Sequence, residues 1–181
     1  MRMTAYCRRP IRGMTLVELT LSLTILSIIS TSVVYMLAAA CNLNSYAQNE
    51  SSAVWEIDFS WHRISANGLA AIPSGSGGMT PTVTTDANGQ SRLTFIVPDQ
   101  ANSTTRTVKY YCTGSAAPYT LVEDDPRYDV AGTPSTIAHN VQLFAAGIDA
   151  STTMKITCDL RINPPAAVAV ERHFVVNCRD F

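Results

Sequence analysis

The stretch Arg12-Gly13-Met14-Thr15-Leu16-Val17-Glu18-Leu19 joins a basic N-terminus to a long apolar run, and the rest of the chain is arranged around it. Residues 1–13 contain four arginines and no acidic residue, and the 22 residues 19–40 contain no charged side chain. As an α-helix, residues 19–40 would be about 33 Å long, enough to cross a bilayer core of about 30 Å. Because a basic segment before an apolar one stays cytoplasmic, we expect the chain after residue 41 on the outer face.

Glu18 lies at the edge of the apolar run and does not fit a plain membrane anchor. A carboxylate there is costly unless a partner neutralises it, so an ionisable group at this position suggests a function. If the chain were cut after Gly13, the new amine of Met14 would lie about one helical turn from Glu18. That amine can pair with this carboxylate or with Glu18 of a neighbouring copy.

The basic leader, Gly13 and the sequence Met14-Thr15-Leu16-Val17-Glu18-Leu19 together resemble the class III signal of type IV pilins and pseudopilins. In that family a prepilin peptidase cuts after the glycine and N-methylates the next residue, which is usually Phe and is Met14 here. The family's glutamate at the fifth mature position, here Glu18, guides assembly. The glycine is a substrate site for another enzyme, so we expect this chain to be no enzyme and to use no cofactor.

Two other interpretations of the N-terminus stay open. An ordinary signal peptide or a simple anchor also has a basic segment and an apolar run, although a secretory apolar region is usually about 7–15 residues and lacks a carboxylate. The sequence Ala38-Ala39-Ala40-Cys41 loosely resembles a lipobox, which would place cleavage and lipidation at Cys41.

Further segments are similar to J-type minor pseudopilins of type II secretion and to W-type minor pilins. Trp55 to Gly68 is similar to the end of their spine helix, Val108-Lys109-Tyr110-Tyr111 resembles their first long strand, and Asn140-Val141-Gln142-Leu143-Phe144 resembles their V-x-x-F strand. The family often closes in an apolar strand, as residues 175–179 do here. The resemblance implies a pilin-like α+β fold, in which a long N-terminal spine helix packs on a mostly antiparallel β-sheet.

Charge and cysteine usage restrict the function. Removal of the leader takes four of 13 basic residues and none of 14 acidic residues, which leaves nine against 14 and a formal charge of −5. We therefore expect no nucleic-acid partner, because such binding needs a basic face. An exported location permits one disulfide among the three cysteines of the soluble part, with the pairing left open. These are Cys112, Cys158 and Cys178.

The periodicity of apolar residues predicts a helix from Met14 to about Ala66, followed by a β domain. One face of its first half carries hydroxyl side chains and suits packing against sibling helices, or is simply tolerated in a membrane. That face consists of Thr20, Thr24, Ser27 and Thr31. Asn67-Gly68 is a plausible helix stop, with Gly supplying a left-handed cap. In the second half of the helix, Trp55, Phe59 and Trp61 fit a core role.

Runs rich in Val, Ile, Thr, Tyr and Phe predict six strands, which no helical pattern interrupts, so the sheet should be largely antiparallel. They span residues 92–97, 107–112, 119–123, 140–148, 154–162 and 168–178. Within 154–162 the apolar residues alternate with polar ones, so this strand should cover a core on one side. The alternating residues are Met154, Ile156, Cys158, Leu160 and Ile162. The expected segments are a leader (1–13), the transmembrane half of the spine helix (14–41), its amphipathic half (42–67), a linker loop (68–91) and the β domain (92–181).

Few residues suggest chemistry. The histidines are widely spaced and read as structural, and no nucleophile motif is present. One acidic loop holds several carboxylates, which suit calcium as a hard cation, although Arg127 within it also favours a solvated turn. The candidate ligands are Glu123, Asp124, Asp125 and Asp129; no other metal site is expected.

The resemblance implies a structural subunit of a type II secretion pseudopilus, a minor subunit of J type at the filament tip. Its partners would be other pilin or pseudopilin subunits, the prepilin peptidase, an inner-membrane assembly platform and membrane lipid. It would cross the inner membrane once, with a cytoplasmic N-terminus and a periplasmic domain, before extraction into a filament. The alternatives are a minor type IV pilin with a surface or DNA contact role, and a lipoprotein held at Cys41.

Overall fold

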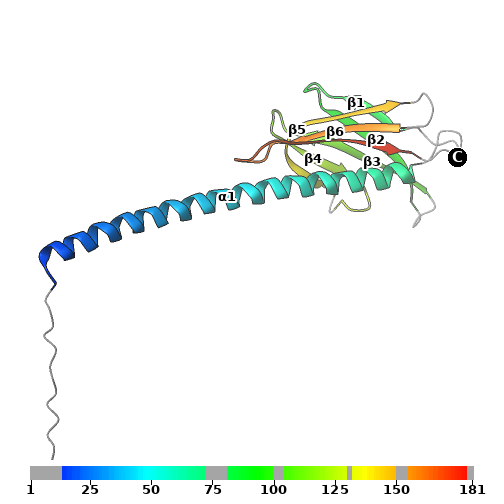
Figure 1. Cartoon of the computed structure of the whole chain (residues 1–181). Helices are drawn as coiled ribbons and strands as arrows, with labels where there is room; N and C mark the ends of the chain where they lie inside the picture. Colours follow the sequence, from blue (N-terminus) through cyan, green and yellow to red (C-terminus); the bar gives the residue numbers. More distant parts are fainter. Residues whose placement is uncertain (1–13, 72–80, 100–103, 130–131, 150–154, 179–181) are drawn as a thin grey trace, which may run out of the picture. The chain divides into compact units, whose positions relative to one another are not determined.

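The computed structural model describes residues 14–71, 81–99, 104–129, 132–149 and 155–178. The leader with Gly13, and residues 72–80 of the expected linker, lie outside these residues. The described chain has one helix and seven strands (Figure 1). They are α1 (Leu16–Ala70), β1 (Thr82–Thr85), β2 (Ser91–Asp99), β3 (Thr104–Thr113), β4 (Tyr119–Asp124), β5 (Ser135–Asp149), β6 (Lys155–Ile162) and β7 (Val170–Asn177).

The chain forms two units, Met1–Asn44 and Ser45–Phe181. In the first unit, the described residues are Met14, Thr15 and the N-terminal part of α1, and all of them are exposed. By length and composition α1 could cross a membrane. An exposed apolar helix of this kind needs lipid or other protein around it, because apolar surface in water is unfavourable.

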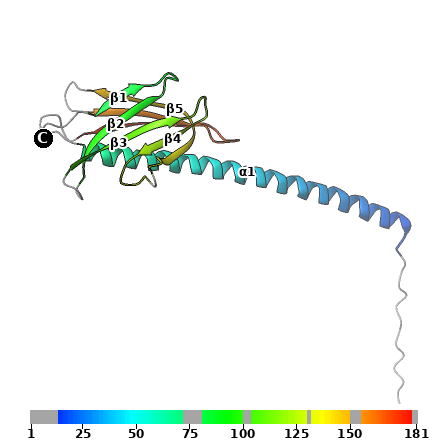
Figure 2. The same cartoon turned by 180° about the vertical axis from the view of Figure 1, so that it is seen from behind.

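The second unit is built on a seven-stranded sheet in which every strand pairs antiparallel with its neighbour in the sequence. β2 also contacts β5, so the sheet curls. Residues 45–70 of α1 lie along one face of the sheet (Figures 1 and 2). The expected α+β class with an antiparallel sheet is thereby confirmed, while the pilin fold itself stays a prediction.

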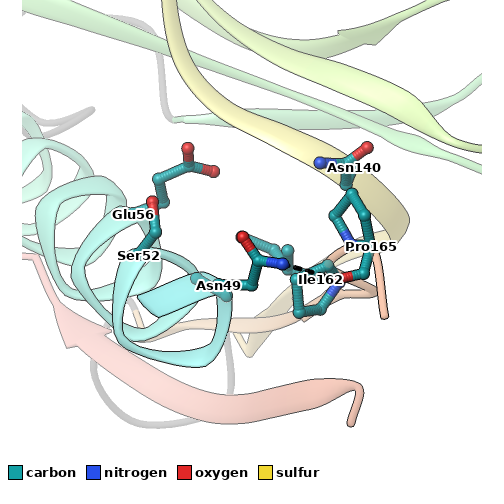
Figure 3. A pocket seen from close by; sticks show the side chains of 8 residues that line it. Asn49, Ser52, Glu56, Asn140, Ile162 and Pro165 are labelled. Atoms are coloured by element: carbon teal, nitrogen blue, oxygen red, sulfur yellow. Dashed lines mark hydrogen bonds between the residues drawn. The ribbon is translucent and has the colours of Figure 1, made fainter. Parts of the chain in front are cut away.

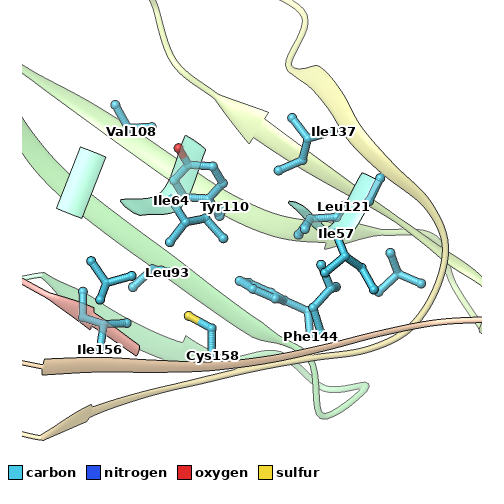
Figure 4. Packing of buried hydrophobic residues seen from close by; sticks show 14 of the residues in the cluster. Ile57, Ile64, Leu93, Val108, Tyr110, Leu121, Ile137, Phe144, Ile156 and Cys158 are labelled. Carbon is cyan, nitrogen blue, oxygen red and sulfur yellow. The ribbon is translucent and has the colours of Figure 1, made fainter. Parts of the chain in front are cut away.

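The core lies between this part of α1 and the inner face of the sheet (Figure 4). Ile57 and Ile64, two turns apart on the helix, are fully enclosed by strand residues that include Leu93, Leu121 and Phe144. The alternation expected for β6 is confirmed, since Ile156, Cys158, Leu160 and Ile162 are all at most 1% exposed.

The end of the helix differs from the expectation. α1 continues through Asn67-Gly68 to Ala70, and Gly68 does not adopt the left-handed conformation of a cap. A Cβ atom on Gly68 would come within 2.5 Å of Cγ1 of Val176 on β7. Glycine is therefore needed here because helix and strand approach closely, and not because the helix stops.

The expected linker 68–91 was also too long, because it contains β1. β1 forms a hairpin with β2 across residues 86–90, where the Asp86 amide donates to the Gln90 carbonyl at 2.8 Å. The Asp86 carboxylate accepts hydrogen bonds from the amides of Asn88 and Gln90, and Gly89 has a positive φ of 76°. Asn-Gly is a common hairpin signal, so Asn88-Gly89 explains the turn.

Candidate functional site

Glu18, the expected assembly residue, closes the first turn of α1. Its Oε2 accepts hydrogen bonds from the backbone amide of Thr15 at 2.9 Å and from the Thr15 hydroxyl at 3.0 Å. The Glu18 amide in turn donates to the Thr15 hydroxyl at 3.3 Å. This reciprocal arrangement is a capping box, which satisfies backbone amides that the helix leaves unpaired at its start. The carboxylate therefore has a local structural role beside any role in assembly.

The hydroxyl face of the helix turns its polar atoms inward to its own backbone. Thr20 donates to the carbonyl of Val17, Thr24 to that of Leu21, and Thr31 to that of Ser27, at 2.8–3.0 Å. The hydroxyls therefore have hydrogen-bond partners without water, which lowers the free-energy cost of placing them in an apolar environment. With the hydroxyls bonded to the backbone, this face presents mainly small apolar groups to its surroundings. A role in packing against sibling helices stays a prediction.

The processing residues stand at the boundary of the described chain. Gly13 lies outside it, and Met14 is its first residue, 61% exposed and directly before the cap residue Thr15. The cleavage and N-methylation expected at Gly13 and Met14 stay predictions.

A buried polar network attaches the second part of α1 to the sheet. Glu123 on β4 is 1% exposed, and its Oε2 accepts hydrogen bonds from Nε of Arg63 at 2.9 Å and from Nη2 of the same guanidinium. Its Oε1 accepts from the Tyr110 hydroxyl at 2.6 Å and from Nδ2 of Asn67 at 3.2 Å. The carboxylate thus joins two helix residues to a residue of β3. Both oxygens of the Glu123 carboxylate accept hydrogen bonds, and a buried charge needs such partners because it has lost its contact with water.

Electrostatics within this network follow from burial. Burial raises the pKa of Tyr110, and the Glu123 carboxylate raises it further because a phenolate would be repelled. Burial lowers the pKa of Arg63, but the hydrogen bond and charge of Glu123 outweigh it and leave the pKa raised. Arg63 also stacks over the Tyr128 ring, 4.3 Å from its centroid. The network therefore consists of the ion pair between Arg63 and Glu123, with Asn67 and Tyr110 as further hydrogen-bond donors to the same carboxylate.

The acidic loop does not assemble the expected calcium ligands. Glu123 is already paired with Arg63. Asp124 pairs with Lys109 at 3.1 Å, and Asp125 pairs with Arg106 at 3.0 Å. The Asp125 carboxylate also accepts a hydrogen bond from the amide of Arg127. Within the described residues, no group of three or more His, Cys, Asp or Glu side chains is placed to hold a metal ion. The calcium alternative, which included Asp129, gains no support from this geometry.

The three soluble cysteines lie on different parts of the sheet. Cys112 is on β3, Cys158 is buried on β6, and Cys178 follows β7. The register places Cys158 opposite Phe174 on β7 and Cys112 opposite Leu121 on β4. A disulfide among them stays a prediction. Burial raises the pKa of Cys112 and of Cys158 to about 12, so both thiols are protonated at neutral pH and are weak nucleophiles.

The expectation of a core role was wrong for two of the three aromatic residues of α1. Trp55 is 65% exposed and Phe59 is 36% exposed, and their rings stack on each other with centroids 5.2 Å apart. Only Trp61 packs against the core, at 4.9 Å from the Phe174 ring centroid. Trp55 lies about 200° around the helix from buried Ile57, so it points away from the sheet. The structure thus presents an aromatic pair on the outer face of the helix.

A polar pocket of about 220 Å³ lies between α1 and the end of β6 (Figure 3). Glu56 stands at one side, where its Oε2 accepts a hydrogen bond from the His139 amide at 2.8 Å. This amide belongs to a bulge in β5, in which Asn140 has a φ of 53°. At the other side, Nδ2 of Asn49 donates to the Pro165 carbonyl at 2.8 Å. The pocket residues therefore serve to fasten the helix to two irregular segments.

Two of the histidines lie beside carboxylates. His139 Nδ1 lies 3.2 Å from Oε1 of Glu56, and His173 Nδ1 lies 2.5 Å from Oδ1 of Asp159 on the neighbouring strand. Comparisons with protein-family models, with curated proteins and with solved structures gave no match for this chain.

Proposed function

We propose that this protein is a pseudopilin-like structural subunit that assembles through α1 into a type II secretion pseudopilus, as a minor subunit of J type at the filament tip. It would be inserted once in the inner membrane, with its N-terminus cytoplasmic and its β domain periplasmic, until it is extracted. A minor type IV pilin is the alternative within the same family. The observation that carries the proposal is Glu18 itself, a carboxylate that caps the first turn of α1, lies directly before the uncharged residues 19–40 and is preceded by a basic leader.

Several features support assembly as the role of the helix. Residues 14–45 are all exposed in the single chain, and their leucine, isoleucine and valine side chains need lipid or other helices around them. The hydroxyls of Thr20, Thr24 and Thr31 are satisfied by the helix itself, so they do not oppose transfer between lipid and a protein environment. The exposed Trp55–Phe59 pair extends apolar surface to the outer face of the second part of the helix.

Mass spectrometry of the N-terminal peptide from membranes of the native host tests processing. A peptide that begins at N-methylated Met14 is the expected result. Lipidation at Cys41 would overturn the proposal and support the lipoprotein alternative. An intact Met1 would indicate a plain anchor.

Three variants separate assembly from helix capping. Glu18→Gln keeps a capping side chain and removes the charge, whereas Thr15→Ala removes a capping partner and keeps the charge. If Glu18 pairs with an amine of a neighbouring subunit, Glu18→Gln and Glu18→Ala insert in the membrane but are depleted from filaments released by shear. Thr15→Ala is then incorporated nearly as well as the unchanged protein. Normal incorporation of Glu18→Ala would remove the proposed role of Glu18, and a defect in Thr15→Ala alone would assign the effect to capping.

A further inference from the structure

β7 forms one edge of the seven-stranded sheet. Its only strand partner among the described residues is β6, and its eight residues contain no proline. The central residues Glu171, Arg172 and His173 are all exposed. An edge strand presents unpaired backbone N–H and C=O groups along its open side, which another extended segment can use. The backbone of β7 is therefore able to accept an additional strand.

The charges of β7 differ between its two faces. On the outer face, Glu171 lies opposite Arg161 of β6 and forms an ion pair with it, and Nδ1 of His173 lies 2.5 Å from Oδ1 of Asp159. On the inner face, Arg172 stands between Val170 and Phe174, which pack against the core. Among the described residues, Arg172 forms no ion pair. The edge thus carries one unmatched positive charge, flanked by apolar residues.

A pocket of about 200 Å³ adjoins this edge, between β7 and α1. Its strand side is made by Arg172, His173 and Phe174, and its helix side by Ile57, Asp58 and Trp61. Trp61 and Phe174, whose ring planes are tilted by 57° with centroids 4.9 Å apart, provide an aromatic surface there. Asp58, like Arg172, forms no ion pair within the described chain. The negative charge of Asp58 disfavours a carboxylate of any bound molecule on the helix side of the pocket.

From these observations we propose that the edge of β7 binds an extended segment of a partner polypeptide, which adds antiparallel as an eighth strand. An acidic side chain of that segment lies opposite Arg172, and an apolar side chain two residues away lies opposite Phe174 and enters the pocket. In this type of recognition, main-chain hydrogen bonds supply affinity, and alternate side chains supply specificity. The partner is therefore a strand with the pattern apolar, any residue, acidic, any residue, apolar. This binding is separate from assembly through α1.

The test uses the full chain in detergent micelles and a fluorescent peptide, acetyl-Thr-Val-Thr-Glu-Thr-Val-Thr-amide, with anisotropy as the readout at low salt. A matched peptide carries Lys in place of Glu, and a third carries N-methyl groups on alternate amides, which removes main-chain donors. We expect the Glu peptide to bind about tenfold tighter than the Lys peptide. The reason is that its Glu forms an opposite-charge cross-strand pair with Arg172, whereas Lys in that position forms a like-charge pair. The N-methylated peptide should not bind.

Charge exchange provides the decisive variant. In Arg172→Glu the preference should reverse, so that the Lys peptide binds more tightly than the Glu peptide. Lys155→Glu on β6 makes the same change in net charge away from the edge and should keep the original preference. The proposal is overturned if the Glu peptide fails to bind at about 1 mM. Equal binding of the N-methylated peptide, or an unchanged preference in Arg172→Glu, would equally overturn it.

Discussion

The Glu123 carboxylate of β4 is held by the Arg63 guanidinium of α1, with Nε and Oε2 2.9 Å apart, although 60 residues separate the two in the sequence. Glu123 is 1% exposed and Arg63 is 27% exposed, so the acid is enclosed while the base reaches the surface. The pair fixes the position of the helix along the sheet, because Asn67 of α1 and Tyr110 of β3 donate hydrogen bonds to the same carboxylate. Together these donors hold the Glu123 side chain in one place.

Removal of one partner should therefore be costly. In Arg63→Met the buried carboxylate loses its cation, and we expect the free energy of unfolding to fall by about 2–4 kcal/mol, somewhat below the loss typical of a fully buried pair. Urea unfolding followed by Trp61 fluorescence, in a Trp55→Phe background, measures the change. Lys109→Met breaks the more exposed pair with Asp124 and should cost at most about 1 kcal/mol. Equal losses in the two variants would contradict a special role for the Glu123 network.

Gly68→Ala tests the close approach of α1 and β7. A Cβ atom there would meet Val176 at 2.5 Å, so we expect a loss of about 1–3 kcal/mol even though alanine favours a helix. The double variant Gly68→Ala, Val176→Ala creates room and should recover part of this loss beyond additivity. If Gly68 instead served as a helix stop, the second substitution would add a full cavity cost, and no recovery would be measured.

The two tryptophans of the helix should differ in their effects. Trp55 is 65% exposed, so Trp55→Ala should change the free energy of unfolding by no more than about 0.5 kcal/mol. Trp61 packs on Phe174 at the core, and Trp61→Ala should cost about 2–3 kcal/mol. Urea unfolding monitored by far-UV circular dichroism compares both variants without reliance on tryptophan emission. A large loss for Trp55→Ala would show that the outer aromatic pair stabilises the single chain.

Alkaline conditions should weaken the β domain. The pKa of Cys112 and of Cys158 is raised from 9.0 to about 12 by burial, with the charges of Asp86 and Asp159 acting in the same direction. Between these values the folded chain binds more protons than the unfolded chain, so stability present below pH 9 is lost as the pH rises through this range.

The urea midpoint measured from about pH 8 to about pH 10.5 checks this linkage. The double variant Cys112→Ala, Cys158→Ala should show a shallower decline with pH, whatever its stability at neutral pH. An identical decline would mean that other groups, such as Tyr110, dominate the alkaline transition.

Local patterns in the sequence predicted much of this fold. Alternation alone placed Ile156, Cys158, Leu160 and Ile162 toward the core, and the helix was evident from its long apolar run. The sequence Thr15-x-x-Glu18 also matches the capping-box pattern, so the local role of Glu18 is contained in four consecutive residues. β1 was missed because Thr82–Thr85 has no apolar alternation and is almost entirely exposed.

Features that depend on distant contacts were not predictable in this way. The need for glycine at position 68 arises from Val176, and the burial of Glu123 arises from Arg63. Both contacts join segments far apart in the sequence, so no local window contains the information. The error over Trp55 had a different cause, because its two-residue spacing from Ile57 already placed the two side chains on opposite sides of a helix.

The strict succession of the strands has a kinetic meaning for a chain that is synthesised from its N-terminus. Each strand from β2 to β7 finds its first partner in the segment that emerged just before it, so pairing can proceed while the remainder is still being synthesised. The helix emerges first and supplies Ile57 and Ile64 as an apolar surface on which the growing sheet can close. β7 emerges last and, in packing against Gly68, completes the domain at the strand whose outer edge remains open.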